Sequence, residues 1–562
     1  MKHAPKLLAG LIALTLLTGT TSSDSKLNDR QRALHALNRL AFGPRPGEVD
    51  AVMKDGVNTW IEQQLHPEAI PDRAVEARIA TLPTMTLSNA QIVKTYYEPV
   101  LLARKQANAE AKSGDVDKQE VRRELMRDVP PNQRPQVVMN DLVAQRILRA
   151  AESDRQLNEV MVDFWMNHFN VFAGKGIDRF LLTSYERDVI RPHIWGRFED
   201  LLMATAKSPA MLFYLDNARS MAAPENRPAM QQQRGFGGPF GFGRRAMVVR
   251  PQQQQGKGQG GLNENYAREI MELHTLGVDG GYTQKDVTEL ARVLTGWSIS
   301  REREGGEGAT FVFRPQMHDA GAKTVLGIRF ASGGGIDEGE RMIHVLAHHP
   351  ATAHRIAYKL CQRLVADEPP PALVARVAKK FLATDGDLRQ TVRAVIESPE
   401  FWSPASYRAK VKSPFEYTIS AVRAVNAQIT DPTPIARALQ QIGEPLYGAQ
   451  PPTGYSDKAD VWINTGALMN RLNFALSLAS NKLPGVHGDV VALIPAGQAA
   501  DASHSVEALA LALTGGNLTE ETRSIIKSRI VERKAPSEDP WDNTQLPTVA
   551  GLILGSPEFQ RQ

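Results

Sequence analysis

Cysteine is nearly absent from this chain of 562 residues, which contains only Cys361. A single thiol cannot form an intramolecular disulfide. It is also too few for a Cys-x-x-Cys-His haem attachment, a zinc ribbon or an iron–sulfur site. Cys361 lies in the apolar periodic stretch 354–365. We therefore interpret it as a small buried residue rather than as a catalytic thiol.

The chain also lacks the run of about 20 apolar residues that spans a bilayer, which excludes a multi-pass membrane protein. A short apolar run, Leu7–Leu17, follows Lys2 and Lys6 and precedes the small residues 18–23. This layout is typical of a secretory signal peptide. We expect residues 1–23 to be such a peptide and the protein to be exported, to the periplasm or the extracellular space. The alternative is a short membrane anchor that stays attached.

The familiar catalytic signatures are absent as well. The sequence contains no His-Glu-x-x-His, no phosphate-binding Gly-x-x-x-x-Gly-Lys, no Gly-x-Ser-x-Gly elbow and no EF-hand loop. One Gly-x-Gly-x-x-Gly match at 256–261 follows a glutamine run instead of the strand that a dinucleotide site requires, so we interpret it as accidental.

The composition is that of a globular protein, with 42% hydrophobic and 23% charged residues. The net charge of +4 leaves nucleic-acid binding open at first. However, the leader contributes +2 and the segment 222–261 contributes +5, which leaves −3 for the remaining body. The sequence therefore predicts no nucleic-acid partner.

Residues 222–261 differ in composition from their surroundings, with nine Gly and eight Gln. This bias predicts a disordered low-complexity insertion. It separates an N-terminal helical part, 24–221, from a C-terminal helical part, 262–562. Within the latter, 262–349 carries most of the motifs and 350–562 is helical. We expect the two parts to form one continuous body.

Helical periodicity runs through most of the remaining chain. The segments predicted to be helical are 30–41, 91–112, 137–172, 199–207, 264–275, 284–295, 338–348, 351–365, 388–397, 414–427, 467–479 and 506–513. Strand-like alternation is confined to 310–314 and 323–330. The predicted fold class is mainly α, a multi-helical globular body with a small β element near 310–330.

Two of these segments carry polar residues that suggest a site. In 160–172, Asp163 falls on a polar stripe, whereas His168 projects from the apolar side toward the core. In 264–275, His274 likewise projects from the apolar face, opposite a charged stripe that includes Arg268 and Glu272. Glu269 lies beside that stripe.

The resulting hypothesis is a divalent metal site, with His168, His274 and Asp163 as ligands and Glu269 or Glu272 as ligand or general base. On an α-helix, a helical-wheel projection places Glu272 and His274 about 160° apart. This counts against the two side chains binding the same ion. The charged stripe and the two histidines can also be explained without any metal site. The charged stripe is then a solvated face, and the two histidines are core residues with satisfied hydrogen bonds.

Two further groups of polar residues are candidates for a site. His344 and His348 have the i, i+4 spacing of a zinc pair, but no neighbouring acid completes the set, so we favour a surface or capping role. His318 and Asp319 precede Lys323 in a segment between elements, where binding residues concentrate. The alternative is structural, because Asp-x-Gly at 319–321 also favours a turn. Arg268 and Asp319 join Glu269 and Glu272 as candidate catalytic residues.

Several blocks together resemble one bacterial family, the domain of unknown function 1800. These blocks are Leu37–Gly47, Asp163–Asn170, Tyr214–Asn217, Asn263–Gly277, Thr295–Trp297, His318–Asp319 with Lys323, and Lys412–Phe415. The resemblance extends from about residue 30 to the C-terminus and implies an exported, mostly helical bacterial protein. It also implies a link to neighbouring exported sulfatase-like or phosphatase-like proteins, and no catalytic role is carried over.

Two functions follow as hypotheses. The first is an exported protein that acts at the cell envelope or on an extracellular polymer as a metal-assisted hydrolase. The second is a non-catalytic helical scaffold that binds an exported sulfatase-like or phosphatase-like partner.

Overall fold

The computed structural model describes residues 26–113, 117–227, 261–300, 308–495, 501–531 and 543–562. The predicted signal peptide, 1–23, lies outside these ranges. So does most of the predicted insertion, from 228 to 260.

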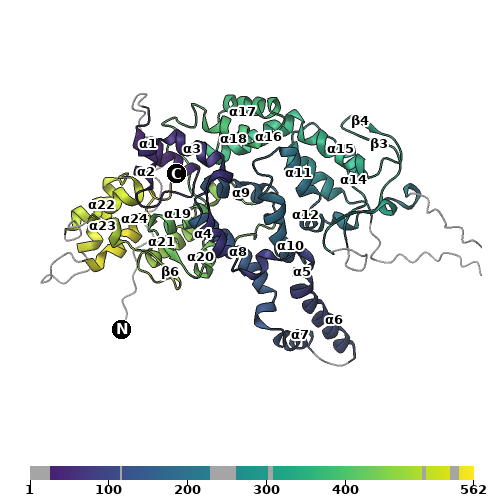
Figure 1. The fold of residues 1–562 in the computed structure, drawn as a ribbon, viewed down its shortest axis with the longest axis horizontal. Helices are drawn as coiled ribbons and strands as arrows, with labels where there is room; N and C mark the ends of the chain where they lie inside the picture. The colour runs from purple at the N-terminus through teal and green to yellow at the C-terminus, as the bar shows by residue number, and fades with distance from the viewer. Residues whose placement is uncertain (1–25, 114–116, 228–260, 301–307, 496–500, 532–542) are drawn as a thin grey trace, which may run out of the picture.

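The described chain is built from α-helices with short strands between them (Figure 1). The α-helices are α1 Asp29–Arg39, α2 Glu48–Asp55, α3 Val57–Leu65, α4 Arg73–Ile79, α5 Asn89–Ile92, α6 Glu98–Ser113, α7 Lys118–Arg127, α8 Gln136–Glu152, α9 Gln156–His168, α10 Asp178–Ser184, α11 Phe198–Ala206, α12 Pro209–Tyr214, α13 Glu264–Glu269, α14 Gln284–Val293, α15 Ile336–Ala347, α16 Pro350–Leu364, α17 Pro371–Ala383, α18 Leu388–Ile396, α19 Pro414–Ala424, α20 Thr433–Ile442, α21 Thr465–Ala479, α22 Ala502–Thr514, α23 Glu520–Val531 and α24 Leu546–Gly555.

The strands form three separate antiparallel pairs. They are β1 Trp297–Ile299 with β2 Phe311–Phe313, β3 Lys323–Val325 with β4 Ile328–Phe330, and β5 Gln428–Ile429 with β6 Val486–His487. The predicted fold class, mainly α with a small β element near 310–330, is confirmed.

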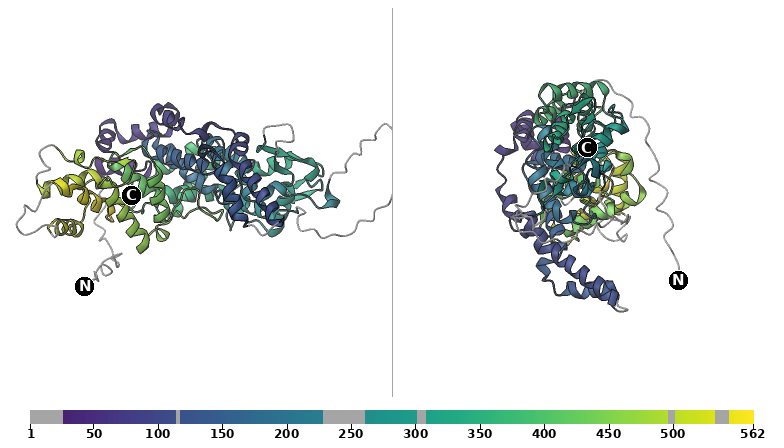
Figure 2. Two further views of the ribbon diagram at one scale, coloured as in Figure 1. Left: turned by 90° about the horizontal axis from the view of Figure 1, so that it is seen from below. Right: turned by 90° about the vertical axis from the view of Figure 1, so that its right-hand side faces the viewer.

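The body is elongated, with α22, α23 and α24 toward one end and β3 and β4 toward the other (Figure 1). The hairpin of α6 and α7 projects from it, as the end-on view in Figure 2 also shows. Within the described residues, none of the helices is both long and apolar enough to cross a membrane.

One predicted helix, 137–172, is two helices in the structure. α8 ends at Glu152 and α9 begins at Gln156. At the break, the Gln64 side chain accepts a hydrogen bond from the Leu157 backbone N–H at 3.0 Å, and Ser153 Oγ donates to Asp72 Oδ2 at 2.7 Å. Distant side chains therefore satisfy backbone and side-chain groups that a continuous helix would arrange differently.

The predicted insertion also differs at its edges. Residues 222–227 belong to the folded body, because Ala222 is buried and Asn226 Nδ2 donates a hydrogen bond to Asp319 at 3.1 Å. Composition alone assigned this stretch to the low-complexity segment.

Most of the core of the described residues lies in two large apolar clusters, and two small clusters complete it. One large cluster is centred on α9, α11 and α13–α18, and the other on α8 and α19–α24. α9 contributes to both, with Met161 and Trp165 in the first cluster and Val160 in the second. The polar stripe of α9 therefore lies where the two cores meet.

Candidate functional site

A polar pocket opens beside the polar stripe of α9. We call it the Asp163 pocket. Its volume is about 60 Å³, which is room for a few water molecules. Its polar lining comes from α8, α9, α16, α19 and the segments 410–413 and 444–457. These residues are Arg146, Asp163, Asn167, Asn170, Arg363, Lys410, Ser413, Glu416, Glu444, Tyr447, Tyr455, Ser456 and Asp457.

Asp163 is held between two guanidinium groups. Arg146 Nη2 donates to Asp163 Oδ1 at 2.9 Å, and Arg363 Nη2 donates to Oδ2 at 3.0 Å. Arg363 also pairs with Glu416 at 3.0 Å. Arg146 and Asp163 lie on successive helices, whereas Arg363 is 200 residues away in sequence, so only the tertiary fold brings it to Asp163. Asp163 was predicted as a metal ligand, and the structure places both of its oxygens on arginines.

Asn167 and Asn170, from the polar stripe that also carries Asp163, hold the segment 449–455 that forms another wall of the pocket. Asn167 exchanges hydrogen bonds with the Tyr455 backbone, at 2.8 and 2.7 Å, and Asn170 Nδ2 donates to the carbonyls of Ala449 and Pro451. Gly454 has φ +71, and a Cβ there would lie 2.3 Å from Asn167 Oδ1. A side chain at 454 would therefore push this wall off α9.

Two glutamates in the pocket have opposite pKa shifts. Burial raises the pKa of Glu444 to about 8, and the negative charge of Asp163 adds to the effect. Burial also acts to raise the pKa of Glu416, but the charges of Arg363 and Lys410 together with hydrogen bonds from Gln562 and Ser413 outweigh it and lower the pKa. At pH 7 Glu444 is therefore a neutral carboxylic acid, and the nearby Glu416 is an ionised carboxylate.

Hydrogen bonds fix both glutamates in place. The Phe415 backbone N–H donates to Glu444 Oε2 at 2.8 Å, and the Ser413 side chain also bonds to Glu444. Ser413 begins α19 in a capping box with Glu416, whose Oε2 accepts from the Ser413 backbone N–H at 2.8 Å. The N-terminus of α19 thus orients both acids.

A buried ion network supports the pocket from behind. Arg191 donates to both oxygens of Glu159 at 2.8 and 2.9 Å and to Glu186 at 2.7 Å. Tyr447 Oη donates to the other Glu186 oxygen at 2.5 Å. Because Tyr447 lines the pocket, the network links the pocket wall to α8, α9 and the π-helical segment Tyr185–Ile190.

His168 and His274 lie side by side in the core, with ring centroids 6.4 Å apart. His168 Nε2–H donates to the His274 carbonyl at 3.2 Å, and both side chains are buried. Burial, with help from Arg355 and Lys359, lowers the pKa of His274 to about 3. His168 is also held neutral, since burial lowers its pKa well below the usual value. The prediction that His168 faces the core agrees with this burial.

The carboxylates predicted to join these histidines lie elsewhere. Glu272 accepts a hydrogen bond from Tyr282 Oη at 3.1 Å, and Arg268 Nη2 donates to Gln284 at 2.7 Å. Glu269 is half-buried, and burial followed by the charge of Glu272 raises its pKa. In the described part of the chain, no carboxylate forms a three-residue ligand group with His168 and His274.

The predicted helix 264–275 changes its winding halfway. α13 ends at Glu269 and continues as the π-helical segment Ile270–Thr275. Thr275 Oγ1 donates to the Ile270 carbonyl at 2.6 Å, which supports the wider turn. The wider π-helical turn still leaves Glu272 and His274, two residues apart, on opposite sides of the segment.

Asp319 is part of a buried ion cluster under the small β element. Arg292 donates to both of its oxygens, at 3.0 and 2.9 Å. Lys323 donates to Glu338 at 2.6 Å, and His318 Nε2 lies 3.3 Å from the same glutamate. Burial acts to raise the pKa of Asp319, but the hydrogen bonds from Arg292 and the Gly321 backbone, with the charges of Arg292 and Lys323, together outweigh it and lower the pKa. The cluster joins α14 and α15 to the strands.

We expect Asp319→Asn to lower the free energy of unfolding by about 1–3 kcal/mol, because it points an amide N–H₂ at a guanidinium in a buried site. Urea unfolding followed by circular dichroism measures the change. The exposed Asp279→Asn serves as the matched control. Equal stability of the two variants would contradict a structural role for Asp319.

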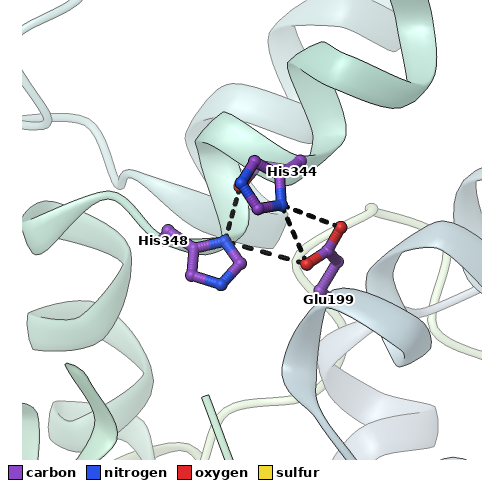
Figure 3. Close-up of side chains that lie close together, drawn as sticks. All are labelled: Glu199, His344 and His348. Atoms are coloured by element: carbon purple, nitrogen blue, oxygen red, sulfur yellow. Dashed lines mark hydrogen bonds and ion pairs between the residues drawn. The ribbon is translucent and has the colours of Figure 1, made fainter. Parts of the chain in front are cut away.

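A third group of side chains meets on the surface. His344 and His348 project from the end of α15 toward Glu199 at the start of α11 (Figure 3). His344 Nδ1 lies 3.0 Å from both Glu199 oxygens, and His348 Nδ1 lies 3.8 Å from Oε2. Among the described residues, this is the group of three histidine and acidic side chains whose ligand atoms all lie within 4.8 Å of one another.

The sequence singled out both histidines of this group but not its acid, because Glu199 lies about 145 residues away from His344. It missed Glu444, Glu416 and Arg363 for the same reason. The one available signal was the Lys412–Phe415 block of the family resemblance, which adjoins Glu416.

Comparison with known proteins gives one match. The sequence profile of the family described as "Protein of unknown function (DUF1800)" matches residues 35–561, which is nearly the whole chain. This helical protein therefore belongs to the DUF1800 family, and the predicted resemblance is confirmed. No curated protein and no solved structure matches it.

Proposed function

We propose that the protein is an exported hydrolase that acts at the cell envelope or on an extracellular polymer, with the Asp163 pocket as its active site. The observation that carries this proposal is the pair of glutamates with opposite pKa shifts in one pocket. Titratable groups whose environments separate their pKa values are typical of acid/base catalysis.

In this proposal Glu444 is the general acid that protonates a leaving group. Its proton is retained at neutral pH because burial and Asp163 raise its pKa to about 8. Asp163 and Glu416 supply negative charge in positions fixed by Arg363. The pocket is too small for a large ligand, which favours one polar substituent or one chain end of a polymer.

Two aromatic side chains of the pocket offer apolar surface beside its polar groups. Tyr455 and Trp462 both line the pocket, and their ring centroids lie 5.9 Å apart. Trp462 Nε1 donates to the Ser456 carbonyl at 3.0 Å, which fixes the indole. Such rings provide rigid apolar surface beside hydrogen-bonding groups. A polysaccharide is therefore the substrate class that we favour.

The experiment compares Glu444→Gln with wild-type protein on a panel of purified bacterial and plant polysaccharides, measuring the release of reducing ends. We expect the variant to lose about 10²–10⁴-fold in rate, the usual contribution of a general acid. Wild-type activity should fall as the pH rises through about 8, because Glu444 then loses its proton. The matched control is the exposed Glu397→Gln, which should retain full activity.

The metal-assisted form of the hypothesis, with His168 and His274 as ligands, stays a prediction. Its support is the proximity of two neutral imidazoles. Elemental analysis of His274→Ala and wild-type protein, both prepared without chelator, tests it. An unchanged metal content in the variant would contradict it.

The scaffold hypothesis is favoured by one specific observation, which is that Asp163 and Glu416 are already paired with arginines. Absence of hydrolysis on the polysaccharide panel, together with an effect of Glu444→Gln on stability alone, would favour the scaffold hypothesis over the hydrolase. Affinity capture from envelope extracts then tests for a sulfatase-like or phosphatase-like partner. N-terminal sequencing of the protein from the periplasm tests export and the removal of residues 1–23.

A further inference from the structure

We propose that Glu199, His344 and His348 bind one divalent transition-metal ion of the zinc class, at a surface site separate from the Asp163 pocket. This metal centre differs from the one predicted from His168 and His274. It also does not depend on the protein being a hydrolase.

The donor set carries the proposal. Two imidazoles and one carboxylate are ligands that suit Zn²⁺ and neighbouring first-row ions, and the harder ions Mg²⁺ and Ca²⁺ prefer all-oxygen sites. His344 and His348 are four residues apart at the end of α15, so both project from one side of the helix. This is the spacing of histidine pairs that bind zinc on helices.

The distances between ligand atoms also fit. Bonds of about 2.0–2.1 Å in a tetrahedral site place two ligand atoms about 3.3 Å apart. The separations of the two histidine nitrogens from Glu199 Oε2 lie on either side of that value, at 3.0 Å for His344 Nδ1 and 3.8 Å for His348 Nδ1. Small side-chain rotations are enough to centre an ion among the three groups.

A second carboxylate orients one ligand. His348 Nε2 lies 2.6 Å from Asp385 Oδ1 in the turn between α17 and α18. Metal-binding histidines usually donate their other ring N–H to such a carboxylate, which fixes the ring. In this structure His348 Nδ1 donates to the His344 carbonyl at 2.8 Å. The bound ion replaces that proton, which passes to solvent.

The backbone around the site is held in place independently of the side chains. The Phe198 N–H donates to the Gly386 carbonyl at 2.8 Å, and the Leu388 N–H donates to the Gly196 carbonyl at 2.9 Å. These bonds fix the α17–α18 turn against the start of α11. Glu199 and Asp385 therefore approach the histidines from a shared, rigid support.

The site is open to solvent on one side, since 57% of the His344 side chain is exposed. Three protein ligands leave the fourth position of a tetrahedral ion to water. The ion would join the N-terminal turn of α11 to the last turn of α15. Its positive charge would also suit the C-terminal end of α15.

The test uses full-length mature protein without a histidine tag, stripped with chelator and then dialysed. Zn²⁺ binding is followed by isothermal titration calorimetry, and Co²⁺ by its visible absorption. We expect one tight equivalent, a tetrahedral Co²⁺ spectrum and a higher Tm with Zn²⁺. His344→Ala, His348→Ala and Glu199→Gln should each abolish the spectrum, and Asp385→Asn should weaken Zn²⁺ binding by about 10–100-fold.

Two controls keep the result interpretable. The exposed His354→Ala removes a surface imidazole outside the group and should bind like wild type. His274→Ala separates this site from the buried histidine pair, and it should leave the Co²⁺ spectrum unchanged if it folds. Circular dichroism of the three ligand variants, which alter surface residues, checks their fold. Zn²⁺ binding that is equal in wild type and in His344→Ala would overturn the proposal.

Discussion

Replacing Arg191 with leucine is expected to lower the free energy of unfolding by about 3–5 kcal/mol. Arg191 is the shared partner of Glu159 and Glu186, whose side chains are only 3% and 1% exposed. Removing it leaves buried carboxylates with too little positive charge, which is far more costly than losing an exposed ion pair. Chemical unfolding of wild type and variant at pH 7 measures the loss.

The loss should depend on pH in a defined direction. Burial acts to raise the pKa of Glu186, but Arg191 and Arg146 outweigh it and lower the pKa to about 2. A folded-state pKa below the unfolded value of 4.5 stabilises the protein above pH 4.5, and this stability is lost as the pH falls toward 2. The difference between wild type and Arg191→Leu should therefore shrink in that window.

The matched control is Arg376→Leu. Arg376 pairs with Glu400 on the surface and is 52% exposed, so its removal should cost about 0–1 kcal/mol. Adding Glu159→Gln to Arg191→Leu removes one of the stranded charges and should recover part of the loss. A loss for Arg191→Leu no larger than that of the surface control would show that the network contributes little.

Glu444→Gln is expected to raise stability at alkaline pH. The pKa of Glu444 is about 8 when folded and 4.5 when unfolded, so folding favours its protonated form. Wild type therefore loses stability as the pH rises from 4.5 to 8, by about 3–5 kcal/mol at the upper end, and a glutamine at 444 has no proton to lose. Unfolding free energies at pH 5 and pH 8.5 measure the effect.

This measurement is independent of substrate, so it tests the environment of Glu444 even if the polysaccharide panel shows no turnover. Glu397→Gln is again the control, because Glu397 is 65% exposed and should show no comparable pH dependence. If the stability difference between Glu444→Gln and wild type is the same at both pH values, Glu444 is not held protonated. The general-acid role would then lose its basis.

Periodicity and composition predicted much of the fold. The predicted helices 467–479 and 388–397 correspond to α21 and α18. Each begins at a capping residue, Asn464 or Asp387, and α18 also has a strongly apolar face. Periodicity did not predict α24. α24 is apolar almost throughout and shows little amphipathic pattern, so its helical state depends on packing against α21.

The π-helical winding of residues 270–275 could not be predicted from the local sequence pattern either. Its residues are compatible with an α-helix, and the prediction of one helix to Thr275 followed from that. The π-helical segment instead fits tertiary contacts, among them the Arg355 Nε bond to the Leu273 carbonyl at 3.1 Å. The local pattern therefore gave the helical state of this segment but not its π-helical winding.

The sequence by itself determined the helical class, the family, and the identity of several polar residues that the structure buries or pairs, such as Asp163 and His168. Only the tertiary structure decided which residues meet. Glu199 approaches His344, and Glu444 approaches Asp163, because separate helices pack together over hundreds of residues. Burial then sets the charge of each group, and burial is a property of packing that no local pattern carries.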